Sequence, residues 1–460
     1  MISLKKRLRP ASLLNWNMRF TKVLVFLIFL AVCLLKLDPD FGWHLASGQY
    51  ILQNGIPKLD IYTYTATDFP WIHHEWLADT IQTILYIIGG YNLIAVFYAC
   101  LWTAAVGLFT QWRQPSLVIF LGVLAIVPLS GVRAIAWTAL CLGLLYALLN
   151  YVPRKFIWLL PLLFLFWANL HGSFILGIGY VLFFVIVKRS WQIVPPLIIA
   201  TAATFINPYG INIYDEIFRT ATDTAIHSRI AEWRSFVLPP SLLLFTGIWA
   251  AGFYLNNWQK IQTYIRFDVL LFIMSLGAMR HTALFVLFAL PETLRSIAAI
   301  RFKKPAANTK DTHAIHRLLI VACLACIMII GYVFYGYTKS FNRFEPSIDP
   351  LLSSIKQSPC DGQIFNDYNV GGYLIWKLPE YKVYIDGRMP SWEHGGKNYM
   401  NDWLRVSDDK NFRITEFKKY AIGCVITADS SFVNDLLSEG WSISDKAAGY
   451  ALLRQKEAPK

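Results

Sequence analysis

Charged side chains are scarce in this sequence. Asp, Glu, Lys and Arg make up 15% of its 460 residues, whereas soluble domains carry roughly 25%. Hydrophobic residues make up 56%, and the mean hydropathy is +0.43. This balance excludes an ordinary soluble protein and predicts an α-helical protein that crosses a membrane several times.

The sequence also lacks a cysteine set typical of a metal or redox centre. Five of its seven cysteines fall in apolar runs, including the CxxC pair Cys323 and Cys326, where small packing residues are expected. Cys360 and Cys424 lie in the more polar C-terminal part. A disulfide between them is open if that part lies outside the cytoplasm, and the sequence leaves the pairing undecided.

Negative charge is sparse in the apolar part of the chain. Residues 1–338 hold 26 basic and 13 acidic residues, while the remainder holds 16 of each, so the first part carries the whole net charge of +13. In a membrane protein, such an excess of basic residues indicates how the chain is oriented across the membrane. We expect no nucleic-acid partner.

Apolar runs predict about eleven membrane spans. The segment 77–90 is too polar for a lipid-facing span, and we interpret it as a helix on the outer surface. With this choice 19 of the 26 basic residues fall on the cytoplasmic side, with the N-terminus inside and the C-terminus outside. The predicted spans are 21–37, 91–110, 116–131, 135–151, 156–170, 173–187, 191–206, 240–255, 267–280, 282–298 and 317–336.

The chain therefore divides into a membrane domain, 1–338, and a soluble domain outside the cytoplasm, 339–460. Loops 38–90 and 207–238 lie on the outer side, and the second is expected to hold a surface helix. The soluble domain is predicted to be mixed α/β. Its predicted strands are 363–365, 372–376, 382–385, 423–427 and 451–454, and its predicted helices are 411–420 and 432–439.

Polar groups from several spans converge on the outer face. Ten of the 13 acidic residues of the membrane domain fall there. Ionisable groups at a membrane are costly unless they are paired or used, so this face is the candidate site. The candidates are Asp38, Asp40, His44, His73, His74, Glu75, Trp76, Arg133, His171, Arg280 and His281.

Sugar transfer from a lipid phosphate fits these residue types. Such a reaction needs a carboxylate that takes the acceptor proton and cations that stabilise the leaving phosphate. Asp38 or Asp40 supplies the first. Arg133, Arg280, His281 and His171 supply the second.

Other interpretations stay open. Asp38 and Asp40 are also typical of a helix cap, and Arg133 and His171 are also suited to pairing with the loop carboxylates. The sequence HHE lacks the second histidine of a zinc-protease motif, because Ala78 stands in its place. A looser divalent site on Asp40 and Glu75, for Mg²⁺ or Mn²⁺, remains open.

Several motifs together resemble a known group. The stretches DPDFGWHLASGQYILQNGIPKLDIYTYT, PWIHHEWLAD, NLHGSFILG, NPYG, MRHTALFVLFALP, FNDYNVGGYLIW and YIDGR resemble bacterial membrane proteins similar to the C-type (GT-C) glycosyltransferases. The chain departs from that group at Ala134, where proline is usual, and at Gly42, where tryptophan is usual. Asp386-Gly387-Arg388, within YIDGR, is expected to form a turn with a salt bridge.

The resemblance implies an inverting glycosyltransferase of the bacterial inner membrane. Asp40 would be the base with Asp38 beside it, the donor would be a polyprenyl-phosphate sugar within the membrane lipid, and the acceptor a glycan, lipid or protein. The alternatives are a transporter of lipid-linked glycans, which would place its ionisable groups near the bilayer midplane, and a membrane scaffold or assembly protein.

Overall fold

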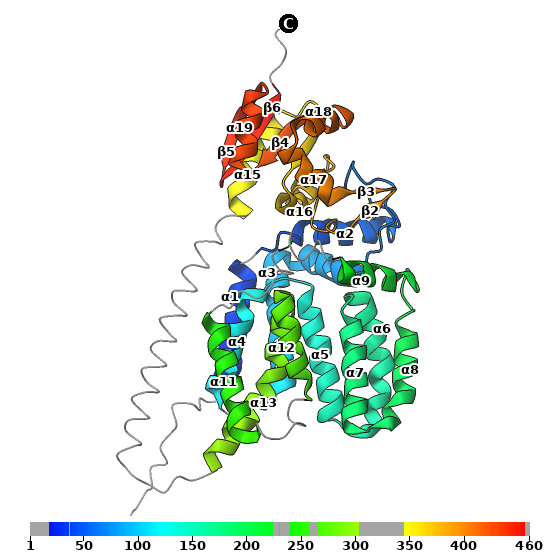
Figure 1. The fold of residues 1–460 in the computed structure, drawn as a ribbon, viewed down its shortest axis with the longest axis vertical. Helices are drawn as coiled ribbons and strands as arrows, with labels where there is room; N and C mark the ends of the chain where they lie inside the picture. Colours follow the sequence, from blue (N-terminus) through cyan, green and yellow to red (C-terminus); the bar gives the residue numbers. More distant parts are fainter. Residues whose placement is uncertain are drawn as a thin grey trace, which may run out of the picture.

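The structure is a computed structural model of the whole chain. It describes residues 18–35, 37–113, 115–223, 230, 240–257, 265–302 and 345–455. Two bodies are apparent in Figure 1: a bundle of roughly parallel helices below, and a smaller α/β domain above. The first outer loop lies between them.

The ten predicted spans between residues 21 and 298 all coincide with helices, and the eleventh, 317–336, lies outside the described residues. α1 and α3 are long and apolar enough to cross a membrane, and several shorter helices are also apolar. The number of spans stays a prediction. The helices are α1 Met18–Leu35, α3 Trp76–Thr110, α4 Ser116–Ile126, α5 Ile135–Asn150, α6 Leu160–Leu170, α7 Phe174–Lys188, α8 Val194–Ala203, α11 Pro240–Asn257, α12 Phe267–Gly277 and α13 Thr282–Phe302.

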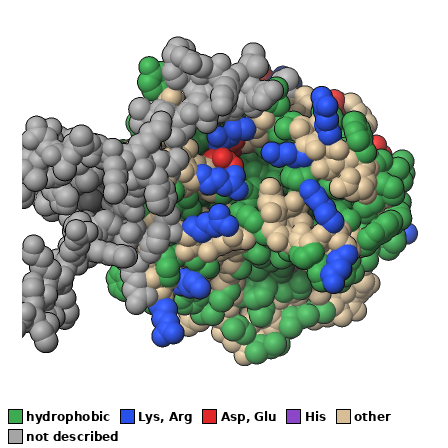
Figure 2. Space-filling model, turned by 90° about the horizontal axis from the view of Figure 1, so that it is seen from below, with side chains coloured by type: hydrophobic (Ala, Val, Ile, Leu, Met, Phe, Trp, Pro, Cys, Tyr) green, Lys and Arg blue, Asp and Glu red, His purple; other side chains and the backbone are tan. Residues whose placement is uncertain are grey.

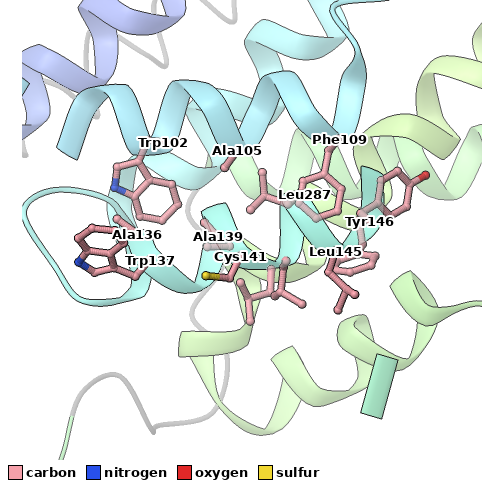
Figure 3. Close-up of a cluster of buried hydrophobic side chains, with 14 of the residues drawn as sticks. Trp102, Ala105, Phe109, Ala136, Trp137, Ala139, Cys141, Leu145, Tyr146 and Leu287 are labelled. Carbon is pink, nitrogen blue, oxygen red and sulfur yellow. The ribbon is translucent and has the colours of Figure 1, made fainter. Parts of the chain in front are cut away.

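The centre of the bundle is aromatic and fully buried. Trp102 and Phe109 of α3 face α5 and α13 in Figure 3, and both side chains have no exposed surface. The ring centroid of Phe109 lies 4.8 Å from that of Tyr146 on α5. Burial of each such side chain stabilises the fold by about 1.5–3 kcal/mol, so this layer holds the helices that carry the site.

The first outer loop forms helices that lie across the upper end of the bundle. α2, Phe41–Asn54, packs against the first half of α3. α3 then kinks at Gly89 and Gly90, where Gly90 has φ +62°, and turns down into the bundle. The predicted surface helix at 77–90 is therefore present, and α9, Asn212–Thr222, is a second one in the other outer loop.

Charge separates between the two ends of the bundle. Figure 2 shows many Lys and Arg side chains and few acidic ones on the lower end. This end carries the connections that hold Arg113, Arg154, Lys155, Lys188 and Arg189. The candidate site residues lie at the opposite end, as predicted, and which end faces the cytoplasm stays a prediction.

The C-terminal domain is mixed α/β, as predicted. Its sheet has the strand order β1-β4-β6-β5, with β1 parallel to β4 and the other pairs antiparallel. Its elements are α15 Glu345–Gln357, β1 Gln363–Asn366, α16 Tyr368–Lys377, β2 Glu393–His394, β3 Lys397–Asn398, α17 Tyr399–Asp408, α18 Lys410–Lys419, β4 Ile422–Thr427, α19 Ser430–Ser438, β5 Trp441–Ala447 and β6 Tyr450–Gln455.

Two predicted strands are wrong. Residues 372–376 belong to helix α16, whose apolar residues are buried on most of its surface; a short apolar run of this kind does not distinguish helix from strand. Residues 382–385 form only isolated bridges, in which Val383 pairs with Ile364 and with Thr63 of the first outer loop. Val383 thus links the first outer loop to β1 of the C-terminal domain through two isolated bridges.

α2 and α16 meet through glycines. A Cβ on Gly42 would lie 2.1 Å from the carbonyl oxygen of Gly372, and a Cβ on Gly372 would lie 2.5 Å from the carbonyl oxygen of Pro39. Side chains at these positions would separate the two helices. The tryptophan that is usual at position 42 in the resembling group has no room in this packing.

We expect Gly42→Ala to destabilise the folded protein. The added methyl group meets backbone atoms that cannot rotate away, and overpacking of this kind costs about 1–3 kcal/mol. Gly179→Ala is the matched control, because a Cβ at Gly179 of α7 meets nothing within 4 Å. Thermal melts in detergent should show a lower melting temperature for Gly42→Ala alone, and equal melting temperatures would contradict the packing.

The structure joins Cys360 to Cys424 in a disulfide, with 5.7 Å between their Cα atoms. It closes a sequence separation of 64 residues. A loop of this length gives a stabilisation of about 2–4 kcal/mol. Replacing both cysteines with serine should therefore lower the melting temperature and remove the mobility difference between reduced and non-reduced gels. Cys100→Ser, at an exposed free cysteine, should change neither.

Candidate functional site

A cavity of about 1110 Å³ lies between the upper end of the bundle, the first outer loop and the C-terminal domain. Ten of the eleven candidates line it: Asp38, Asp40, His44, His73, His74, Glu75, Arg133, His171, Arg280 and His281. Trp76 does not. Its indole nitrogen donates to Asn169 Oδ1 at 2.9 Å, which ties the start of α3 to the end of α6.

Asp38 is held in place before α2 begins. Its Oδ2 lies 2.6 Å from Nε of Arg133, and its Oδ1 accepts the backbone N–H of Asp40 at 3.0 Å. The expected pairing of Arg133 with a loop carboxylate is present, whereas the expected helix cap is not, because Asp40 occupies the N-cap position of α2 without a capping hydrogen bond to its side chain. Asp38 is therefore fixed, and it holds Arg133 at the cavity wall.

Asp40 lies beside Asp38 at the start of α2 and faces the C-terminal domain. A Cβ on Gly387 would lie 1.7 Å from its Oδ1, so only glycine fits at that point. Burial and the neighbouring charge of Asp38 raise the pKa of Asp40 to about 6, against the opposing effect of His44 and Arg133. This carboxyl group is well suited to take up a proton near neutral pH.

Glu75 has the opposite electrostatic environment. Its Oε1 lies 3.2 Å from His171 Nε2 and 3.6 Å from His74 Nε2. Although burial acts in the other direction, these two histidines hold the pKa of Glu75 well below its usual range. His171 Nδ1 in turn lies 2.7 Å from Ser173 Oγ. Glu75 is therefore a permanent charge within a histidine network.

His44 and Asp79 form the deeper part of the cavity. His44 donates from Nδ1 to Asp79 Oδ1 at 2.7 Å, and this nitrogen lies 3.7 Å from Glu75 Oε2. Against the effect of burial, the charge and the hydrogen bond of Asp79 raise the pKa of His44 to about 9. His73 Nε2 lies 3.0 Å from Asp79 Oδ2. The sequence singled out the histidines but not Asp79, whose place one helical turn after Glu75 was the available signal.

Arg280 and His281 belong to a 3₁₀ turn, Met279–His281, between α12 and α13. Both line the cavity. Arg133 lines the same cavity, so two guanidinium groups border this space. Two neighbouring guanidinium groups are an arrangement that favours an anion with several oxygens, such as a phosphate.

The C-terminal domain supplies the last wall. Arg388 pairs with Asp386 at 2.6 Å, as the sequence predicted, and also with Asp60 of the first outer loop at 2.8 Å. Arg388 and Gly387 line the cavity together with Trp392 and Trp403. The pairing with Asp60 spans the two parts of the chain, and no local pattern indicates it.

The donor set for a divalent metal differs from the expected one. Ligand atoms of His44, Glu75 and Asp79 all lie within 4.8 Å of one another. Glu75 is thus in the group as expected, whereas Asp40 lies outside it. Two carboxylates with an imidazole are ligands that divalent transition metals accept in proteins, so these residues fit such an ion.

No protein-family model matches the sequence, and no curated protein matches it. Solved structures do match. The archaeal oligosaccharyltransferase AglB from Archaeoglobus fulgidus, in complex with an inhibitory peptide and a dolichol-phosphate, gives a TM-score of 0.57 at 12% identity. The match covers 89% of this chain and 69% of that one.

A second AglB structure, in complex with Zn and sulfate, gives a TM-score of 0.55 at 12% identity, over 88% of this chain and 67% of that one. ArnT from Cupriavidus metallidurans, bound to undecaprenyl phosphate, gives 0.55 at 8% identity, over 96% of this chain and 99% of that one. The chain therefore has the fold of these GT-C glycosyltransferases.

Proposed function

We propose that this protein is a membrane glycosyltransferase. It transfers a sugar from a polyprenyl-phosphate donor to a glycan, lipid or protein acceptor outside the cytoplasm, with inversion at the sugar carbon. Its place is the bacterial inner membrane, with the C-terminal domain on the outer side. The fold shared with AglB and ArnT supports the class of reaction.

The cavity is the observation that carries this proposal. It brings the carboxylate of Asp40 to the same space as Arg133 and Arg280. A displacement at a sugar carbon needs this separation of roles: a base on the acceptor side and cations on the leaving phosphate. The bundle below the cavity is apolar, which suits the tail of a lipid-linked donor.

The carboxylates of the cavity are suited to different tasks. Asp40, whose pKa is raised to about 6, takes the acceptor proton as the acceptor oxygen attacks. Asp38 is engaged with Arg133 and keeps that guanidinium in position for the phosphate. Glu75 stays charged within its histidines. In many active sites, neighbouring carboxyl groups have pKa values shifted in opposite directions, and one then acts as a base while the other remains a fixed charge.

The donor phosphate is assigned to the wall formed by Arg280, His281 and Arg133, with His171 nearby. These groups belong to three separate connections at the upper end of the bundle, after α4, α6 and α12. The departing phosphate gains negative charge during transfer, and guanidinium donors stabilise it.

A transporter of lipid-linked glycans is less well supported. Transporters place their ionisable groups near the middle of the membrane, often on broken helices. Among the described residues the cavity groups gather at one end of the bundle instead. A scaffold protein has no need for a raised carboxyl pKa opposite two guanidinium groups.

We expect Asp40→Asn to abolish sugar transfer while the protein stays folded. Loss of a general base lowers the rate by about 10²–10⁴-fold, which should be measured as product formed from radiolabelled polyprenyl-phosphate sugars. Asp68→Asn is the matched control, because the Asp68 side chain is 76% exposed. Transfer by Asp40→Asn at the wild-type rate would remove Asp40 from the mechanism.

We also expect undecaprenyl phosphate to raise the melting temperature of the purified protein. Arg280→Ala should lose most of this shift, because a charge-assisted contact to the phosphate is removed. Arg113→Ala, at an exposed arginine that follows the far end of α3 from the site, should keep it. An equal shift in all three proteins would place the phosphate elsewhere.

A further inference from the structure

We propose that an open groove in the lower half of the bundle binds one anionic phospholipid, with the lipid phosphate at Lys22 and Arg113. The groove has a volume of about 640 Å³ and lies between α1, α3 and α5. It shares no lining residue with the cavity of the candidate site. The proposal therefore does not depend on the proposed sugar transfer.

The length of the groove matches one leaflet of a bilayer. Its α3 wall runs from Cys100 to Gln111, which are eleven residues apart. At 1.5 Å of rise per residue this wall is about 16 Å long, and half of the hydrocarbon core of a membrane is about 15 Å thick. Ala104 and Gly107 on α3, with Ala147 on α5, leave the space open. One acyl chain fits along it.

The lower mouth of the groove combines aromatic rings with cations. Trp112 and Tyr151 line it. Nζ of Lys22 lies 5.6 Å from the Trp112 ring centroid, and the guanidinium carbon of Arg113 lies 5.8 Å from the Tyr151 ring centroid. Tryptophan and tyrosine are enriched at the level of lipid headgroups. This mouth is therefore where the headgroup of a lipid in the groove would lie.

Charge selects an anionic lipid. α1 holds no Asp or Glu, and neither does the stretch 80–214, which includes the lower part of α3 and all of α5. Lys22 and Arg113 are both exposed, and Figure 2 shows the same basic character across this end of the bundle. Basic pockets between membrane helices are typical sites for anionic headgroups. Phosphatidylglycerol fits this charge, whereas the choline cation of phosphatidylcholine meets no carboxylate there.

The backbone is strained at the same place. Gln111 and Trp112 have φ of +49° and +52°, a region that side chains other than glycine seldom adopt. This turn brings the indole of Trp112 back over α3, so that a Cβ on Gly107 would lie 2.7 Å from the indole nitrogen. Strained residues persist where the surroundings hold them and gather at binding sites. Here the strain keeps an indole N–H at the groove, where a lipid oxygen can accept it.

The first test is native mass spectrometry of the full chain in detergent, with phosphatidylglycerol and phosphatidylcholine of equal acyl chains. The wild-type protein should retain one phosphatidylglycerol per chain and bind phosphatidylcholine more weakly. The double variant Lys22→Ala, Arg113→Ala should bind phosphatidylglycerol roughly 30-fold more weakly, from the loss of two basic residues at an anionic headgroup. Equal binding of the two lipids, or full binding by the double variant, would overturn the proposal.

Matched variants separate the groove from the rest of the surface. Lys188→Ala removes an exposed basic residue at the end of α7, outside the groove, and should keep phosphatidylglycerol. Ala104→Trp fills the groove and should lose the lipid. Leu144→Trp, at a 41% exposed position of α5 outside the groove, should keep it. Lipid retained by Ala104→Trp as by Leu144→Trp would contradict the site.

The unmodified protein gives a test that needs no variant. Cys100 is an exposed free thiol on the groove wall. Phosphatidylglycerol should slow its alkylation by a maleimide, measured by mass spectrometry of the peptides, and phosphatidylcholine should not. An unchanged rate would refute the proposal.

Other occupants of the groove have their own signatures. A cross-link from Cys100 to Cys323 or Cys326 would place the predicted span 317–336 in the groove. A dimer that forms as the lipid is lost would place a second copy of the chain there, and displacement of phosphatidylglycerol by undecaprenyl phosphate would make the groove a prenyl-lipid site. Each of these results would overturn the assignment to a phospholipid.

Discussion

The buried guanidinium group of Arg388 is the contact on which the site depends. Its side chain is 3% exposed and lies between the carboxylates of Asp386 and Asp60. The faces of Tyr62, Trp71 and Trp392 surround it. A buried ion pair loses about 3–5 kcal/mol when one partner is removed, because the other charge stays buried. Arg388 therefore fixes the C-terminal domain to the first outer loop.

This loop belongs to both parts of the fold. Phe69 and Trp71 are members of the hydrophobic core of the C-terminal domain, and Phe69 stacks on Trp392 with 4.1 Å between ring centroids. Phe41 belongs to the core of the bundle instead. Because the loop packs into the domain through Phe69 and Trp71 and into the bundle through Phe41, Gly387 comes to lie against the Asp40 carboxylate. The cavity forms only where residues of this one loop pack into both hydrophobic cores.

The sequence predicted much of this site because charge in an apolar chain is conspicuous. Asp38, Glu75, Arg133 and Arg280 stand out from their apolar flanks, and the charge bias of the loops placed them on one face. The fold brings them to one cavity. Hydrophobic periodicity indicates the helices, and charge bias indicates which helix ends share a face; this prediction rests on these two kinds of information.

Long-range pairings were beyond that information. Asp79 resembled a surface residue of an amphipathic helix, and its partner His44 is 35 residues away. The pairing of Asp60 with Arg388 crosses more than 300 residues of sequence. Helix α16 was mistaken for a strand because the purpose of its glycines is the close contact with α2. That contact depends on a second, distant segment, which the local sequence does not reveal. The local sequence pattern does not predict which distant residues or segments come into contact.

The likeness to AglB and ArnT fixes the fold but not the chemistry, because identity is 12% or less. The chemistry depends on how the surroundings of each carboxyl group in the cavity shift its pKa. Glu75 is buried and Asp40 is half-buried, and the pKa of Asp40 is raised whereas that of Glu75 is lowered. Glu75 has two histidines against it, whereas Asp40 has a second carboxylate and a glycine. Asp40 is therefore the carboxylate that we propose as the base, and the C-terminal domain covers it with Gly387 in place of a side chain.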